Sequence, residues 1–194
     1  MGINSSFEEN DHEHIESRLL RDRIIFLGSV IDDEIANTMI QQLRFLEEQD
    51  VDKDIFIYIN SPGGSVPAGL NLYNAMQKIK PDIATICVGL AASMAAIVLS
   101  AGTKGKRMAQ STARIVINRP VGGKQIIQPE DLTSATWQYR QELELGYYRQ
   151  TLAEIFSIHT GQSVQQIYKD TEIDYCLSSQ EALQYGFIDR IIDR

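Results

Sequence analysis

The stretch from Ile83 to Gly102 reads IATICVGLAASMAAIVLSAG and contains no charged side chain. Its first half is rich in β-branched residues and its second half in alanine, with Gly89 between them. This pattern predicts a strand, a tight turn and a helix. An uncharged run of about 20 residues is also long enough to span a membrane. Asp82 before the run and Lys104 after it favour a buried unit of a soluble domain instead.

Ser93 lies among small residues near the centre of this stretch. A serine at a strand-to-helix junction is a common position for a nucleophile, because backbone N–H groups of the following turn are free to hold an oxyanion. Such a serine can also cap the helix or simply allow close packing. The stretch alone leaves both interpretations open.

Composition limits the classes of function. The chain has 194 residues, 43% hydrophobic and 23% charged, which fits one globular domain. A net charge of -8 argues against binding to nucleic acid or to anionic membranes. Two cysteines, Cys87 and Cys176, in apolar surroundings are too few for a disulfide scaffold or a zinc site. We therefore expect no metal and a reducing, cytosol-like compartment.

Alternating strand and helix patterns follow a polar, acidic segment (1–16) that we expect to be a flexible arm. The expected strands and helices are 23–28, 32–48, 55–59, 67–79, the stretch at 83–102, 106–108, 113–118, 129–158, 163–170, a short helix opened by a Ser178–Glu181 capping box, and 186–192. The long helix from Pro129 exceeds what one domain needs to cover its core, which indicates an assembly element. A histidine at its end, His159, would complement the helix C-terminus.

A glycine pair, Gly63-Gly64, follows the strand at 55–59. Without the lysine and the spacing of a phosphate loop, this turn is a poor nucleotide site. It either points N–H groups at a carbonyl oxygen or is an ordinary strand-to-helix turn.

Several motifs together resemble ClpP, the serine peptidase of the ATP-dependent Clp proteases. In chain order they are SRLL at 17–20, RIIFL at 23–27, YINSPGGS at 58–65, AASM at 91–94, KGKR at 104–107, HTGQ at 159–162, and Ala182 with Tyr185-Gly186. The resemblance implies a crotonase-like α/β fold of repeated βαβ units with a projecting strand-helix handle. It divides the chain into the arm (1–16) and one ClpP-like domain (17–194), with the handle at about 119–160.

The resemblance also implies the roles of the site residues. It places the nucleophile on Ser93, the oxyanion donors on the backbone N–H groups of Gly64 and Met94, and the triad aspartate on Asp174. The triad histidine is expected directly after the strand that ends at Ile117, where this chain has Asn118. A serine hydroxyl needs a base to become a nucleophile at neutral pH, and an amide has no useful basicity. Neither His12, His14 nor His159 is a plausible replacement.

The family also binds a separate ATPase through an apolar pocket. Eight residues fall on its lining: Phe56, Tyr58, Lys78, Ile86, Val88, Met108, Gln110 and Ile192. Lys78 and Gln110 depart from the apolar character that we expect there. Ile173 stands where the family has an arginine that pairs across two rings, and the handle is longer than usual by about seven residues.

We therefore expect a catalytically inactive or impaired ClpP-like subunit of the ClpR type. It would assemble with active paralogues in seven-membered rings, two rings stacked, and receive polypeptides from the ATPase. It would need no cofactor, since ATP is used by that partner alone, and would reside in the cytoplasm or in a plastid stroma. The alternatives are an active serine endopeptidase and, less favoured, a crotonase-fold acyl-CoA enzyme.

Overall fold

The computed structural model describes residue 15 and residues 17–120 and 134–193. Most of the predicted arm (1–16), part of the predicted handle (121–133) and the Pro129 start of the long helix lie outside these residues. In the described residues no helix is long and apolar enough to cross a membrane.

The strands of the described residues form one seven-stranded sheet, in which β1, β2, β3, β4 and β7 lie side by side and parallel. Their bounds are β1 Ile24–Leu27, β2 Ile55–Ser61, β3 Ile83–Ala92, β4 Arg107–Gln110, β5 Arg114–Ile117, β6 Tyr175–Ser178 and β7 Arg190–Ile192. Strand β5 is parallel to the end of β3, and β6 is antiparallel to β5. The predicted α/β fold of repeated βαβ units is confirmed.

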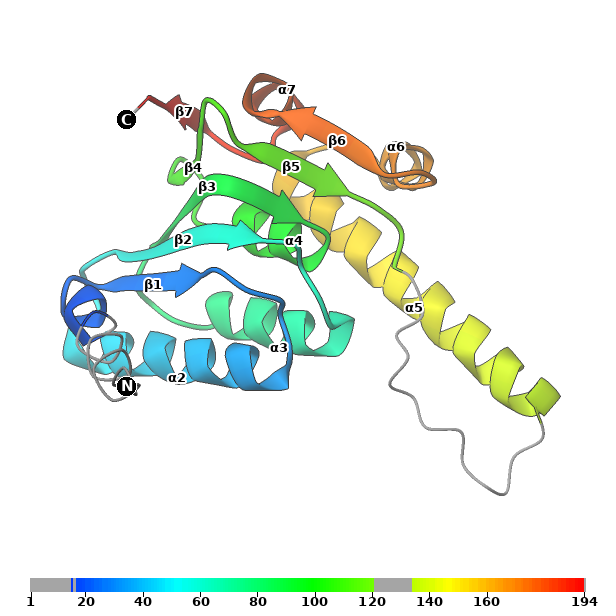
Figure 1. Ribbon diagram of the computed structural model, residues 1–194, viewed down its shortest axis with the longest axis horizontal. Coiled ribbons are helices and arrows are strands. Elements are labelled where there is room, and N and C mark those ends of the chain that lie inside the picture. Colours follow the sequence, from blue (N-terminus) through cyan, green and yellow to red (C-terminus); the bar gives the residue numbers. More distant parts are fainter. Residues whose placement is uncertain (1–14, 16, 121–133, 194) are drawn as a thin grey trace, which may run out of the picture.

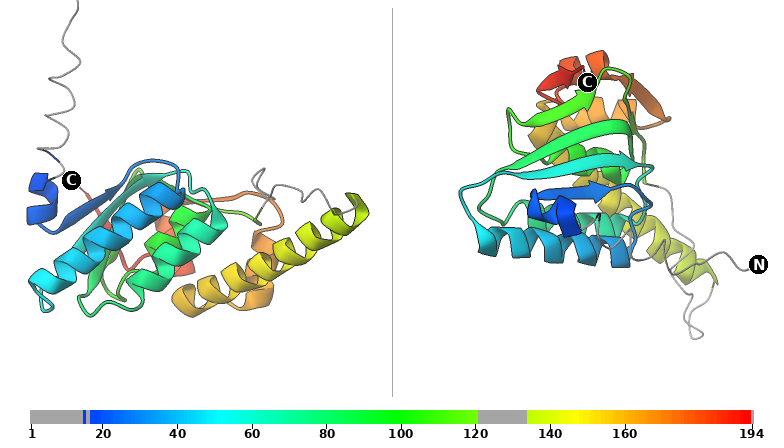
Figure 2. Two further views of the ribbon diagram at one scale, coloured as in Figure 1. Left: turned by 90° about the horizontal axis from the view of Figure 1, so that it is seen from below. Right: turned by 60° about the vertical axis from the view of Figure 1, so that its left-hand side comes forward.

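Helices cover one face of this sheet (Figure 1). Their bounds are α2 Asp33–Gln49, α3 Val66–Met76, α4 Met94–Ser100, α5 Ser134–Thr160, α6 Val164–Asp170 and α7 Ser179–Tyr185. Helices α2 to α5 run beneath the strands, whereas α6 and α7 flank β6. Figure 2 shows that the first part of α5 extends away from the sheet. Tyr139, Leu143 and Tyr147 on this part are exposed, as a projecting helix requires.

Side chains of β2 alternate between the two faces of the sheet, as strand geometry dictates. Ile55, Ile57 and Ile59 are buried in the main core beneath the sheet. Phe56 and Tyr58 point to the opposite face, where they join a second, smaller apolar cluster. The sheet is therefore apolar on both faces.

Three predicted helix starts are confirmed by their caps. Asp32 accepts a hydrogen bond from the Ile35 amide at 2.8 Å, and Ser163 accepts one from the Gln166 amide at 3.1 Å. The Ser178–Glu181 capping box is present at α7. Each side chain satisfies an amide that the helix itself leaves unpaired.

Three predicted boundaries were wrong. The closing strand expected at 186–192 begins only at Arg190. The turn expected at Gly89 lies at Ser93, because β3 continues through Gly89 to Ala92. The side chain of Asn60 occupies the space beside Gly89, and its Oδ1 accepts a hydrogen bond from the Leu90 amide at 3.0 Å. Helix α3 ends at Met76, three residues before the expected Ile79. Strand β6 was not predicted at all.

Candidate active site

Ser93 connects β3 to α4 in a backbone conformation that only a few residues adopt. Its φ is 52° and its ψ is -120°, and it is one of two non-glycine residues with positive φ in the described chain. The Ser93 side chain makes no capping hydrogen bond to α4. Such a conformation costs about 1–3 kcal/mol and persists where the surrounding structure enforces it. Here the Ser93 amide donates to the Val116 carbonyl at 2.9 Å.

The glycine turn packs directly against Ser93. Gly63 has a φ of 87°, and a Cβ atom on it would lie 2.5 Å from the Ala92 oxygen and 2.9 Å from the Ser93 Cβ. Only glycine therefore fits at this position. Ser61 fixes the turn, because its hydroxyl donates to the Ser29 carbonyl and accepts from the Gly63 amide at 3.1 Å.

Met94 follows Ser93 in the chain, and Gly64 follows Gly63, which packs against Ser93. The Ile31 amide donates to the Gly63 carbonyl at 2.8 Å, and the Ser65 amide donates to the Ile31 carbonyl at 2.7 Å. These two hydrogen bonds join Ile31 to the glycine turn, and neither of them uses the N–H of Gly64. Met94 is the first residue of α4, where an amide has no acceptor within its own helix. The oxyanion role of both amides stays a prediction.

Strand pairing brings Asn118 and Asp174 to the same end of the sheet as Ser93. Ile117 on β5 pairs with Tyr175 on β6, so Asn118 and Asp174 lie one position beyond this pair. The Asp174 side chain is exposed, whereas the Asn118 Oδ1 is buried without a hydrogen-bond partner. In the described residues no hydrogen bond joins the side chains of Ser93, Asn118 and Asp174.

No histidine of the described residues lies beside Ser93. His12 and His14 lie outside those residues, and His159 lies at the other end of the sheet. Its Nε2 is 3.2 Å from the Tyr73 hydroxyl, against which the ring packs edge-on. Burial and the neighbouring charge of Arg107 lower the pKa of His159. This shift disfavours the charged imidazole, and the role of His159 at the helix C-terminus stays a prediction.

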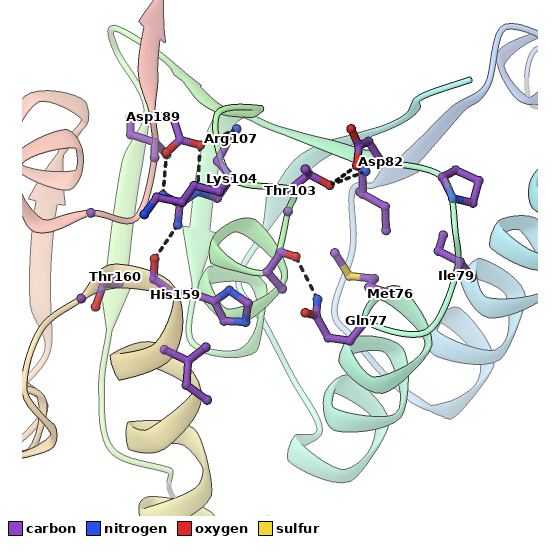
Figure 3. A pocket seen from close by; sticks show the side chains of 18 of the residues that line it. Met76, Gln77, Ile79, Asp82, Thr103, Lys104, Arg107, His159, Thr160 and Asp189 are labelled. Carbon is purple, nitrogen blue, oxygen red and sulfur yellow. Dashed lines mark hydrogen bonds and ion pairs between the residues drawn. The ribbon is translucent and has the colours of Figure 1, made fainter. Parts of the chain in front are cut away.

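Arg107 provides the charge at that helix end. Its Nη1 donates to the His159 carbonyl at 2.8 Å and to the Ser100 carbonyl at 3.4 Å, while its Nη2 pairs with Asp189 at 2.7 Å. These groups border a pocket of about 690 Å³ between the ends of α3, α4 and α5. Figure 3 shows His159 and Gln77 facing this pocket from α5 and α3. The pocket is distinct from the Ser93 site, which lies at the carboxyl ends of the strands.

The predicted ATPase-docking residues gather on the open face of the sheet, with two exceptions. Six of them belong to the second apolar cluster: Phe56, Tyr58, Ile86, Val88, Met108 and Ile192. Gln110 pairs with Ile192 at the edge of this cluster. Lys78 instead follows the end of α3, which covers the opposite face of the sheet. Within a single chain it therefore does not join the other predicted docking residues. The docking role stays a prediction.

The cysteines differ in their surroundings. Cys87 is buried, which raises the pKa of its thiol to about 11. Cys176 is exposed on β6, so the prediction that both lie in apolar surroundings was wrong for this residue. In the described part of the chain no group of three or more His, Cys, Asp or Glu residues could hold a metal ion.

Sequence reasoning missed the residues that hold the site in place. Ser61 and Asn60 were read only as part of a turn motif, although they fix the glycine turn and the end of β3 respectively. Small polar residues before a glycine pair are a weak signal, because most such residues only begin turns. Strand β6, which carries the chain from Asp174 alongside β5, was also missed because Tyr175–Ser178 is too short for a periodic pattern.

Comparison with protein families agrees with this geometry. The family model described as Clp protease matches residues 7–194, which is nearly the whole chain. The matched range includes Ser93, the glycine turn, Asn118 and Asp174. The chain belongs to the Clp protease family.

Proposed function

We propose that this chain is a non-catalytic subunit of a Clp protease core. Asn118 carries the proposal, because it occupies the position after β5 where the triad needs a base. Loss of the base in a serine triad lowers turnover on the order of a million-fold. The glycine turn and the rare backbone conformation of Ser93 remain. The chain therefore keeps the backbone that would position a serine nucleophile but lacks the base that would activate it.

The subunit would contribute to the structure of the protease complex rather than to peptide hydrolysis. We propose mixed heptameric rings with active paralogues, stacked in pairs through the handle that contains α5. The exposed Tyr139, Leu143 and Tyr147 support a contact there. The apolar cluster on the open face of the sheet would bind a neighbouring subunit and the loop of a partner ATPase. ATP would be used by that partner alone, and the compartment would be cytoplasm or plastid stroma.

Restoring the base tests the proposal. The variant Asn118→His should gain hydrolysis of a fluorogenic peptide, since it returns a titratable nitrogen to the end of β5. The matched control is Asn118→His combined with Ser93→Ala, which should be inert. A gain that survives loss of Ser93 would show that the activity comes from elsewhere.

Two rival functions predict other results. An active serine endopeptidase would require peptide hydrolysis by the unmodified chain with a base from a neighbouring subunit. A crotonase-fold acyl-CoA enzyme would be stabilised by acyl-CoA in a thermal shift measurement, because ligand binding to the folded state raises the melting temperature. A non-catalytic subunit predicts neither hydrolysis nor a shift.

A further inference from the structure

We propose that the pocket between the ends of α3, α4 and α5 binds a small monoanionic acid, a carboxylate that carries an apolar tail. The pocket lies at the amino ends of the strands, whereas Ser93 lies at the carboxyl ends, so the inference does not depend on the proposed function. Its volume of about 690 Å³ is within the usual range for small-molecule sites.

The charged side chains that line the pocket give it a net positive charge when His159 is neutral. Three of them are cationic, Lys80, Lys104 and Arg107, and two are the carboxylates of Asp82 and Asp189. The complete chain has a net charge of -8, so the charge of the pocket is opposite to that of the chain. A ligand with one negative charge would neutralise the pocket, which favours a monoanion.

The C-terminal ends of the helices do not exclude an anion, because donors already occupy three of the carbonyls there. Arg107 Nη1 donates to two of them, the carbonyls of Ser100 in α4 and His159 in α5. Gln77 Nε2 donates to the third, the Ala101 carbonyl, at 3.0 Å. These hydrogen bonds offset the partial negative charge that a helix carries at its C-terminus.

Two ammonium groups of the pocket are left for a ligand. Its two carboxylates are paired with Lys106 and Arg107. The side chains of Lys80, which follows α3, and Lys104, which follows α4, form no hydrogen bond or ion pair with any other residue that the structure describes. Both lysines are exposed, so an anion can reach them from solvent. A carboxylate can accept hydrogen bonds from both.

The apolar side chains of the lining indicate the rest of the ligand. Figure 3 shows Met76 and Ile79 on the side of the pocket opposite His159. Ile158 also lines the pocket and is 73% exposed. An apolar tail that covers Ile158 would remove this surface from water, which is favourable. A carboxylate joined to a short hydrocarbon chain matches both parts of the lining.

Equilibrium dialysis of radiolabelled octanoate against the purified full-length chain tests the site. One equivalent per chain should bind, and binding should weaken as salt is raised, because the two lysines are exposed. Octanol and octylamine carry the same tail without the negative charge. Displacement of octanoate by either compound as strongly as by unlabelled octanoate would overturn the inference, as would the absence of binding.

Matched lysine variants assign the binding to the pocket. Lys80→Met combined with Lys104→Met should weaken octanoate binding about 25-fold, about fivefold for each exposed charge pair. Lys169→Met, at an exposed position of α6, should bind as the unmodified chain does. Equal affinities of the double variant and Lys169→Met would contradict the assignment.

A second pair of variants tests the apolar part of the site. Ile158→Ser should weaken binding about threefold, because the tail loses an apolar contact. Ile173→Ser, which changes an isoleucine of similar exposure outside the pocket lining, is the control and should have no effect. Melting temperatures of all variants show whether each remains folded. Ile158→Ser that is folded and binds octanoate as tightly as Ile173→Ser would overturn the role of the tail.

Discussion

At the amino ends of the parallel strands Lys106 and Arg107 are paired with carboxylates, whereas at the carboxyl ends the side chains of Ser93, Asn118 and Asp174 are not joined to one another. Arg107, at the start of β4, is buried and pairs with the partly buried Asp189, which precedes β7. Lys106 pairs with Asp54 at 2.7 Å and with Asp82 at 2.8 Å, before β2 and β3. The amino ends thus carry ion pairs, whereas the carboxyl ends carry Ser93 in its rare backbone conformation and the unpaired Asn118 Oδ1.

The contrast has a physical reason. A buried charge is tolerated only when it is paired and hydrogen-bonded, and Arg107 meets this condition through Asp189 and two helix carbonyls. A residue in a rare backbone conformation persists only where its neighbours hold it, and Ser93 is held by the glycine turn and by Val116. Ligands of open α/β sheets bind at the carboxyl ends of the strands, where Ser93 lies.

The largest expected effect comes from breaking the paired end. Arg107→Met leaves the Asp189 carboxylate partly buried without its partner, so the free energy of unfolding should fall by about 3–5 kcal/mol. Urea denaturation measures the loss. Arg44→Met, at an exposed position of α2, is the matched control and should change stability by less than about 0.5 kcal/mol. Equal losses in the two variants would contradict the importance of the pair.

A smaller loss is expected from the support of the glycine turn. Ser61→Ala removes the hydroxyl that joins the Ser29 carbonyl to the Gly63 amide inside the protein. The buried Gly63 amide and the partly buried Ser29 carbonyl lose their partner, which should cost about 1–3 kcal/mol of unfolding free energy. Ser111→Ala, at an exposed turn, should have almost no effect in the same denaturation experiment. A Ser61 variant as stable as the Ser111 variant would show that the turn does not depend on this hydroxyl.

The smallest expected effect has the opposite sign. Ser93→Gly should raise the free energy of unfolding by about 0.5–1 kcal/mol, because glycine adopts the Ser93 conformation without strain. Ser163→Gly is the matched control at an ordinary helix cap, where the serine accepts from the Gln166 amide. That change should lower stability by a few tenths of a kcal/mol. Destabilisation in both variants would argue that Ser93 carries no strain.

The sequence predicted the positions of the strands and helices better than the contacts around Ser93 and His159. The apolar runs at 24–27 and 55–59 and the capping residues Asp32, Ser163 and Ser178 predicted the order of strands and helices correctly except for β6. These signals are local, because burial, alternation and caps depend on neighbouring residues.

The remaining features depend on contacts between distant segments. Gly89 was read as a turn because a glycine after a β-branched run usually ends a strand, yet here it makes room for Asn60 from β2. His159 was interpreted from its place at a helix end, but its burial and the charge of Arg107, a residue distant in sequence, lower its pKa. Asn118 was located from the family pattern, and only the structure reveals that its oxygen is buried and unpaired.

Peptide hydrolysis by the unmodified chain tests the central claim most directly. The purified full-length protein and its Ser93→Ala variant are incubated with the same fluorogenic peptide, and the released fluorophore is followed over time. A chain with a nucleophile and no base predicts equal rates for the two proteins, at the background of the peptide alone. Hydrolysis by the unmodified chain that Ser93→Ala abolishes would contradict the account.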